Sequence, residues 1–209
     1  MSAVRRLGVL GGTFDPIHYG HLRAGDAAGE SLQLDEILVI PSHDPPHRAL
    51  DPKASAYHRF ALAALAIDGR SRWRLSDAEL TRSGPSYTAH TLRALHAEGW
   101  QASQIFFIIG TDAFAEIATW YDYPAVLDLA HFAVVTRPGT PATPTRSAGI
   151  SYVNADTPDI SSTDIRSRLA AGLSIADLVP RAVERYILNH RLYSAAVNDL
   201  HGETERIHR

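Results

Sequence analysis

Short apolar runs alternate with amphipathic stretches along most of the chain. Four runs rich in branched or aromatic residues have the pattern of buried strands, and they lie at residues 7–10, 37–40, 105–109 and 132–136. Weaker strand candidates lie at residues 73–75 and 150–153. Between these runs, apolar residues recur at helical spacing over residues 21–34, 57–67 and 88–98. This alternation predicts a parallel sheet with helices on both faces.

The pattern changes beyond about Ala155, where only helices are expected. Residues 162–171 and 181–192 have helical spacing, with Gly172 closing the first helix and Pro180 preceding the second. We therefore predict an α/β fold with a doubly wound, Rossmann-like parallel sheet and a small helical C-terminal subdomain. The predicted boundaries are 1–155 for the sheet domain, 156–194 for the helical subdomain of the same unit, and 195–209 for a polar tail.

Composition and charge exclude several classes of protein. The 209 residues are 45% hydrophobic and 21% charged, which is typical of a globular domain and excludes a disordered chain, a collagen-like fibre and a disulfide scaffold. A formal net charge of −3 gives no support for nucleic-acid binding. Without cysteine there is no thiolate nucleophile or Cys-ligated zinc. No apolar run approaches the roughly 18 residues of a membrane span, so a cytoplasmic protein without a membrane partner is expected.

The most informative stretch reads GGTFDPIHYGH over residues 11–21, at the carboxyl end of the first expected strand. Gly11 and Gly12 allow close backbone approach to a ligand, and their amides can face an anion. A helix that begins just beyond this turn offers unpaired N–H groups and a positive dipole end. His18 and His21 are three residues apart and can point to one place. This arrangement suits a phosphate whose negative charge rises during a reaction.

This stretch also has simpler interpretations. It could be an ordinary Gly-Gly turn followed by a surface histidine. A zinc site is disfavoured, because the chain has no HExxH motif and no third ligand in obvious register with His18 and His21. The dinucleotide fingerprint GxGxxG and the P-loop ending GK[ST] are both absent after this strand. Their absence argues against a standard dehydrogenase and a P-loop kinase.

A second stretch, Gly110, Thr111 and Asp112, directly follows the expected strand at residues 105–109. Taken alone it could be an ordinary turn with Asp112 as a helix cap. In a sheet of order 3-2-1-4-5, however, the first and fourth strands flank the topological switch point. Ligands bind there, outside the carboxyl ends of the strands. We therefore expect both glycine-containing turns to line one crevice.

A third stretch reads ISSTDIR over residues 160–166. Ser161 followed three residues later by Asp164 predicts a capped helix start. The same helix start would also present the hydroxyls of Ser162 and Thr163 and the guanidinium of Arg166 to a phosphate.

Taken together, these residues resemble a known family. Residues 12–21 look like the nucleotidyltransferase signature with its HxGH core, and residues 160–166 look like the second phosphate motif of that family. Residues 86–88, 110–114 and 120–121 narrow the resemblance to bacterial nicotinate-mononucleotide adenylyltransferases, over about residues 7–192. The resemblance implies transfer of AMP from ATP to nicotinate mononucleotide in NAD biosynthesis, giving deamido-NAD and pyrophosphate, with Mg²⁺ as cofactor.

The resemblance also implies roles for individual residues. His18, His21 and Arg166 would be catalytic and would stabilise charge on the phosphates of ATP. The implied ATP-binding residues are Gly11, Gly12, Thr13, Phe14, Arg48, Gly110, Asp112, Ser162 and Thr163. The implied residues for nicotinate mononucleotide are Thr88, Trp120, Tyr121 and Arg137. Mg²⁺ would be held mainly by the ATP phosphates, near Asp112.

One departure from the family pattern is visible after Pro45 and Pro46. Family members usually have lysine after the Pro-Pro-His run, whereas His47 is followed here by Arg48. The charge is kept, but a planar fork replaces a point charge. The loop could still contact a phosphate, and the alternative is that His47 and Arg48 are solvated loop residues.

The expected mechanism is direct in-line attack by the acceptor phosphate on the α-phosphorus of ATP, because the chain has no cysteine and no serine with a partnered histidine in a recognisable motif. No general base is needed for an already ionised phosphate. Three alternatives remain open. Pantetheine-phosphate adenylyltransferase shares the first motif but does not require residues 86–88 or 120–121. A class I aminoacyl-tRNA synthetase would need a longer chain, and a nucleotide-sensing module would bind ATP without turnover.

Overall fold

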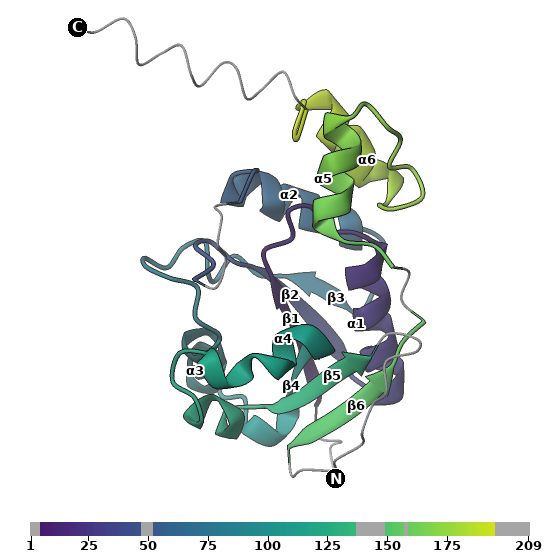
Figure 1. Ribbon diagram of the computed structural model, residues 1–209. Coiled ribbons are helices and arrows are strands. Elements are labelled where there is room, and N and C mark those ends of the chain that lie inside the picture. Colours follow the sequence, from purple (N-terminus) through teal and green to yellow (C-terminus); the bar gives the residue numbers. More distant parts are fainter. Residues whose placement is uncertain (1–4, 47–51, 137–148, 157–158, 195–209) are drawn as a thin grey trace, which may run out of the picture.

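Six parallel strands form a single sheet in the computed structural model, which describes residues 5–46, 52–136, 149–156 and 159–194. The order is β3-β2-β1-β4-β5-β6, so the chain moves outward from β1 in one direction and then from β4 in the other (Figure 1). The strands are β1 (Leu7–Gly12), β2 (Glu36–Pro41), β3 (Trp73–Leu75), β4 (Ile105–Gly110), β5 (His131–Thr136) and β6 (Ile150–Asn154). The predicted doubly wound sheet is confirmed, and its switch point lies between β1 and β4.

Helices cover both faces of this sheet. They are α1 (Tyr19–Ser31), α2 (Ala56–Ile67), α3 (Thr88–Ala97), α4 (Thr111–Ala115), α5 (Ser162–Ala170) and α6 (Arg181–Asn189). Single-turn 3-10 helices occupy Ala102–Gln104, Ile117–Thr119 and Ala125–Asp128. Figure 1 shows α1 on one side of the sheet and α3 with α4 on the other. None of the helices within the described part of the chain combines the length and apolar character that crossing a bilayer requires.

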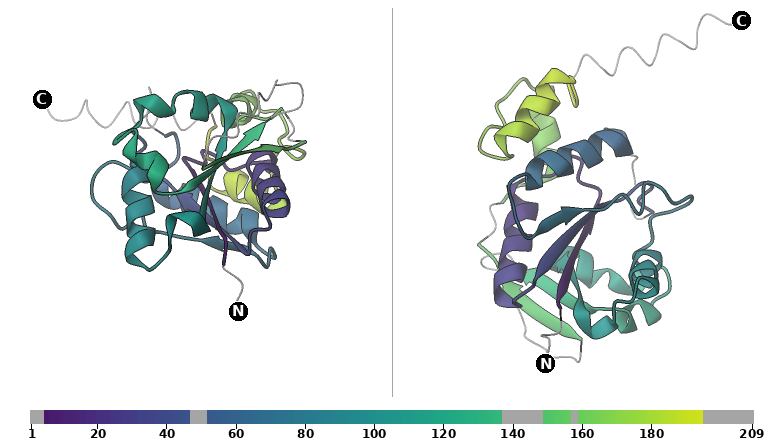
Figure 2. Two further views of the ribbon diagram at one scale, coloured as in Figure 1. Left: turned by 90° about the horizontal axis from the view of Figure 1, so that it is seen from below. Right: turned by 180° about the vertical axis from the view of Figure 1, so that it is seen from behind.

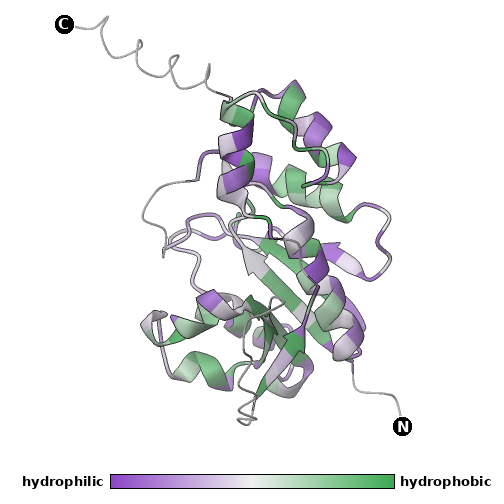
Figure 3. Ribbon diagram, turned by 45° about the vertical axis from the view of Figure 1, so that its right-hand side comes forward, coloured by the Kyte–Doolittle hydropathy of each residue, from purple (hydrophilic) through white to green (hydrophobic). Residues whose placement is uncertain are grey.

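Burial on both faces explains why the strands read as continuous apolar runs. In β4, Phe106 and Ile108 belong to the apolar cluster under α1 and α2, whereas Ile105, Phe107 and Ile109 belong to the cluster under α3. Successive side chains of a strand point to opposite faces, so a strand covered on both sides needs apolar residues throughout. Coloured by hydropathy, the strands are largely green, while the helices carry both colours (Figure 3).

The two C-terminal helices lie beside α2, at one end of the sheet (Figure 2). Ile165 of α5 and Val183 and Ile187 of α6 are fully buried in the same apolar cluster as the side chains of α1 and α2. Backbone bonds add to this packing, since Tyr19 N donates to Leu178 O at 3.0 Å. The start of α1 is therefore tied directly to the segment between α5 and α6.

Two helices end earlier than their apolar periodicity predicts. The helix expected over residues 21–34 ends at Ser31, and the helix expected over residues 181–192 ends at Asn189. In both cases a residue in the left-handed region follows, with φ of 52° at Gln33 and at Arg191. A left-handed residue terminates a helix while apolar residues beyond it still pack on the core, so periodicity overestimates the helix length.

Candidate active site

A cavity of about 590 Å³ opens at the carboxyl ends of β1 and β4. Gly11 and Gly12 at the end of β1 and Ile109 and Gly110 at the end of β4 form part of its wall. The cavity lies at the switch point, where a doubly wound sheet leaves a crevice between diverging connections. The crevice predicted from the two glycine-containing turns is confirmed.

Most of the expected site residues line this one cavity, although they come from distant parts of the sequence. They are Gly11, Gly12, Thr13, His18, His21, Thr88, Gly110, Asp112, Trp120, Ser162 and Thr163. Three others, Phe14, Tyr121 and Arg166, lie close to the wall without being part of it. Arg48, its neighbour His47, and Arg137 lie outside the described residues.

The two histidines lie side by side at the start of α1. His18 is the residue before the helix and is buried, and its ring centroid is 3.8 Å from that of His21. His21 Nδ1 accepts a hydrogen bond from the His18 backbone N–H at 3.3 Å. A neutral imidazole that accepts at Nδ1 carries its proton on Nε2. This hydrogen bond fixes the orientation of the His21 ring at the start of α1.

Packing around the histidines explains other residues of the motif. A Cβ atom at position 20 would lie 2.9 Å from the His18 ring, so Gly20 makes room for that imidazole. Phe14 is buried, and its ring meets the edge of His21 with centroids 5.1 Å apart. Phe14 therefore packs against His21 beside the cavity, and its implied role in ATP binding remains a prediction.

The start of α5 forms a second wall of the cavity. Ser161 Oγ accepts from Asp164 N at 3.0 Å and donates to Asp164 Oδ2 at 2.6 Å, which confirms the predicted cap. Ser162 Oγ donates to the carbonyl of Pro16 at 2.9 Å. Thr163 Oγ1 accepts from Arg166 Nη2 at 3.1 Å, so its own hydroxyl proton can be donated to a ligand.

Arg166 lies between α5 and the loop that follows β1. Its Nη1 donates to the carbonyl of Asp15 at 2.8 Å and is 3.8 Å from Asp15 Oδ2. The guanidinium has five N–H donors, of which these bonds to Asp15 and Thr163 use two. Arg166 thus joins two walls of the cavity, and direct contact with a phosphate remains a prediction.

Aromatic residues lie at the end of the cavity away from the starts of α1 and α5. Thr88 begins α3, as predicted, and lines the cavity together with Trp120. The Trp120 ring is partly buried and meets Phe107 edge to face at 6.0 Å, so it both packs on the core and faces the cavity. Tyr121 is 48% exposed and stacks on Tyr87 with centroids 4.4 Å apart.

The motifs did not reveal a buried carboxylate in this half of the cavity. Glu79 follows β3, is 7% exposed, and accepts a hydrogen bond from Thr91 Oγ1 at 2.5 Å. Both residues line the cavity. Thr91 lies one helical turn after Thr88, which places both hydroxyls on one face of α3. That spacing, and the position of Glu79 beyond a strand's carboxyl end, are the signals that could have identified the pair.

Arg59 is a further residue that the sequence analysis did not identify. It is 1% exposed in α2, and its guanidinium donates to the carbonyls of Ala54, Thr13, Ser42 and His43 over 2.6–3.2 Å. These carbonyls belong to the loops after β1 and β2 and to the segment before α2. Arg59 therefore holds the floor of the cavity in place. An arginine inside an otherwise apolar helix gives no signal of this role in a single sequence.

Ionisable groups in the described part of the chain do not form a cage for a metal ion. No cluster of three or more histidine, aspartate or glutamate side chains gathers at one point among those residues. Asp112, in the first turn of α4, is exposed and contributes a single carboxylate to the cavity wall.

Two helix starts face the cavity at the switch point, one with the HxGH motif and one with the Ser-Ser-Thr run. This combination defines the class of protein as a nucleotidyltransferase. Residues 9–168 match the Cytidylyltransferase-like family. Curated relatives named probable nicotinate-nucleotide adenylyltransferase include one from Desulfatibacillum aliphaticivorans, 39% identical over 90% of this chain and 99% of its own length. A second relative with this name, from a Synechococcus strain, is 42% identical over 90% of this chain and 95% of its own length. The chain belongs to the nicotinate-nucleotide adenylyltransferase family.

Solved structures agree on the fold. The nicotinic acid mononucleotide adenylyltransferase of Plasmodium falciparum, complexed with APC, is similar with a TM-score of 0.73 at 20% identity, over 90% of this chain and 97% of that chain. A putative nicotinate-nucleotide adenylyltransferase of Vibrio parahaemolyticus gives a TM-score of 0.61 at 23% identity, over 91% of this chain and 96% of that chain.

Proposed function

We propose that this protein transfers AMP from ATP to nicotinate mononucleotide, giving deamido-NAD and pyrophosphate. The observation that carries the proposal is that one cavity joins two chemically different ends. One end has two helix N-termini with His18 and His21, and the other has Thr88 and Trp120. Relatives about 40% identical over most of the chain are named for the same reaction.

The first end suits the phosphates of ATP. The N-termini of α1 and α5 both border the cavity, and helix N-termini attract anions through unpaired N–H groups and the helix dipole. His21 Nε2–H and the hydroxyl of Thr163 add two side-chain donors. In the reaction, an oxygen of the acceptor 5′-phosphate forms a bond to the α-phosphorus while the bond to pyrophosphate breaks. Donors held in place for the growing charge lower the barrier without needing a nucleophile from the protein.

The second end suits the acceptor. Thr88 begins α3, so its amide and hydroxyl lie at a positive dipole end and can meet a carboxylate. Trp120 offers a flat face to a pyridinium ring, combining stacking with cation–π attraction. Glu79 and Thr91 border the same region, and the carboxylate can balance a cationic ring. Together these groups fit a ring with a positive charge and an anionic substituent.

Mg²⁺ is proposed as the cofactor, carried mainly by the ATP phosphates. The donors present fit this role, since Asp112 supplies one exposed carboxylate and Mg²⁺ prefers to keep several waters beside one or two carboxylates. When bound, the ion neutralises charge on the phosphate oxygens and on pyrophosphate. Asp112 would contact the hydrated ion and orient it toward the cavity.

The proposal is tested by incubating the purified chain with ATP, Mg²⁺ and one acceptor at a time. The acceptors are nicotinate mononucleotide, nicotinamide mononucleotide and phosphopantetheine, and the products measured are pyrophosphate and the adenylylated acceptor. We expect both products with nicotinate mononucleotide, with kcat/KM at least about tenfold above that for nicotinamide mononucleotide, because an unmatched donor costs about 1–3 kcal/mol. ATP binding without pyrophosphate from any acceptor would instead indicate a nucleotide-sensing module.

A further inference from the structure

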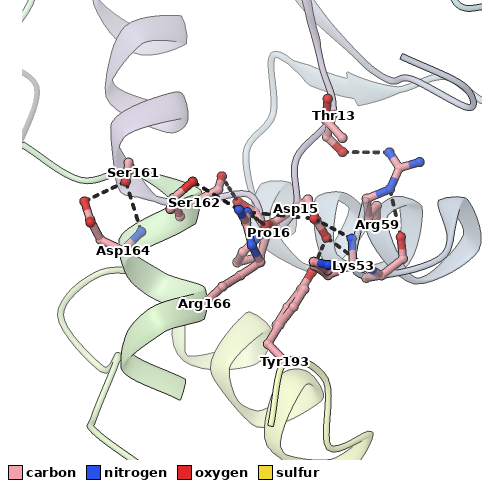
Figure 4. Close-up of polar contacts among 12 residues, drawn as sticks. Thr13, Asp15, Pro16, Lys53, Arg59, Ser161, Ser162, Asp164, Arg166 and Tyr193 are labelled. Carbon is pink, nitrogen blue, oxygen red and sulfur yellow. Dashed lines mark hydrogen bonds and ion pairs between the residues drawn. The ribbon is translucent and has the colours of Figure 1, made fainter. Parts of the chain in front are cut away.

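The loop after β1 contains a buried carboxylate that no proposed step of the reaction uses. Asp15 is 1% exposed. Its Oδ1 accepts from Ala54 N at 3.1 Å and from the Tyr193 hydroxyl at 2.9 Å, and its Oδ2 accepts from Lys53 N at 2.9 Å (Figure 4). A buried carboxylate is stable only when hydrogen bonds replace its hydration. The side chain therefore fixes its own loop to the segment before α2.

The same loop also joins the two phosphate-facing helices. The Asp15 carbonyl accepts from Arg166 Nη1, and the neighbouring Pro16 carbonyl accepts from Ser162 Oγ. Both donors belong to α5, while α1 begins three residues after Pro16. The relative placement of the two helix N-termini therefore depends on where the loop at residues 15–16 lies.

Tyr193 reaches this loop from the far end of the chain, 178 residues from Asp15. Tyr193 lies four residues beyond the end of α6 at Asn189. Arg191 and Tyr193 are both in the left-handed region, with φ of 52° and 65°. This conformation is unfavourable for residues with a Cβ, and it persists where surrounding contacts compensate for it. Burial, together with the negative charge of Asp15, raises the pKa of the Tyr193 hydroxyl above its ordinary value, so the hydroxyl stays protonated as a donor.

We infer that Tyr193 is a positioning residue for the phosphate half of the cavity, meaning the part bordered by the N-termini of α1 and α5. It acts on these N-termini through Asp15. This inference rests on the proposed function. Without the hydroxyl, Oδ1 of the buried carboxylate keeps only the Ala54 N–H among the bonds described. The loop can then shift, and with it the donors that face the triphosphate. The acceptor half is built from α3 and Trp120, which make none of the Asp15 contacts described.

The variant Tyr193→Phe tests the inference, with Tyr186→Phe as its matched control. Tyr186 lies in α6, and its hydroxyl bonds to His58 Nδ1 at 3.0 Å, outside the Asp15 contacts. Steady-state kinetics are measured with ATP and nicotinate mononucleotide varied in turn, and ATP affinity is measured by calorimetry. We expect Tyr193→Phe to weaken ATP binding and raise the KM for ATP by about tenfold, the size of one hydrogen bond to a charged group. The KM for the acceptor should stay within about twofold, and Tyr186→Phe should leave both KM values unchanged.

A double-mutant cycle separates positioning from general loss of stability. If Tyr193 acts through Asp15, adding Tyr193→Phe to Asp15→Asn should change ATP affinity much less than it does in the wild-type chain. Equal changes in both KM values, no change in either, or full additivity in the cycle would each overturn the inference. A wild-type chain that binds ATP but forms no dinucleotide would refute the proposed function alone, since ATP affinity would still decide the role of Tyr193. A wild-type chain without affinity for ATP would refute both.

Discussion

The two halves of the cavity are built in different ways. In the phosphate half, which the starts of α1 and α5 border, Ser162 and Arg166 of α5 are hydrogen-bonded to the loop at residues 15–16. That loop leads along the chain into the start of α1. In the acceptor half, the main groups are the aromatic ring of Trp120 and the buried pair of Glu79 and Thr91.

On the proposed function, the difference matches what each half would have to recognise. The charge distribution of a triphosphate changes during the reaction. The protein's hydrogen-bond donors lower the barrier only when they are already in place for the charge that develops. An acceptor ring is distinguished by shape, charge and one substituent, which a few side chains can read. Changes in the phosphate half should therefore reduce turnover or ATP binding. Changes in the acceptor half should alter the KM and selectivity for the acceptor.

The largest effect is expected for His21→Ala. If the Nε2–H of His21 stabilises charge that grows during the reaction, kcat should fall by about 10²–10³, or roughly 3–4 kcal/mol. The affinity for ATP should change much less, because the contribution is realised mainly in the transition state. Stopped assays for pyrophosphate together with ATP calorimetry measure both quantities. Equal losses in turnover and binding would indicate a ground-state contact instead.

Arg166→Ala should give the next largest effect. It removes the donors to Asp15 and Thr163, and with them a positive charge from the side of the cavity proposed to bind the triphosphate. Affinity for ATP and for pyrophosphate should fall by about 1.5–3 kcal/mol, the range for hydrogen bonds to charged groups. Binding of nicotinate mononucleotide should be nearly unchanged, as calorimetry with each ligand can determine. Equal losses for all three ligands would mean that Arg166 serves only to tie α5 to the sheet.

In the acceptor half, Trp120→Ala should raise the KM for nicotinate mononucleotide at a cost of about 1–3 kcal/mol, if values for base stacking apply to this ring. The KM for ATP should change little. Because Trp120 also packs against Phe107, thermal unfolding of the variant should be measured alongside its kinetics. An unchanged acceptor KM would remove the stacking role and leave only the packing role.

How far apart two contacting residues lie in the sequence decides whether their contact can be predicted from it. Strand periodicity and glycine-containing turns are local, and they were sufficient to predict the sheet, its switch point and the crevice there. The capped start of α5 was also predictable, because Ser161 and Asp164 are three residues apart.

Contacts between distant residues could not be predicted in this way. Arg59 bonds to Thr13 across 46 residues, and Tyr193 bonds to Asp15 across 178 residues. No pattern in one sequence pairs such residues, since their proximity arises only when the sheet has formed. Even a residue inside a recognisable motif can have a contact that the motif does not predict. The resemblance implies that Phe14 binds ATP, but it did not predict that the Phe14 ring packs against His21.

The smallest effect is expected at the amino end of β5, outside the cavity, and it concerns stability at low pH. His131 begins β5 and bonds to Ser151 Oγ at 2.9 Å. Burial, followed by the nearby charge of Arg6, lowers the pKa of His131 below its ordinary value of 6.5. Around and below that pH the unfolded chain therefore binds a proton that the folded chain resists binding, so stability falls as the pH is lowered. Urea unfolding at pH 7.5 and 5.5 should show a larger drop in midpoint for the wild type than for His131→Asn. An equal drop in both would show that His131 does not contribute, and kinetic comparisons could then extend to the lower pH.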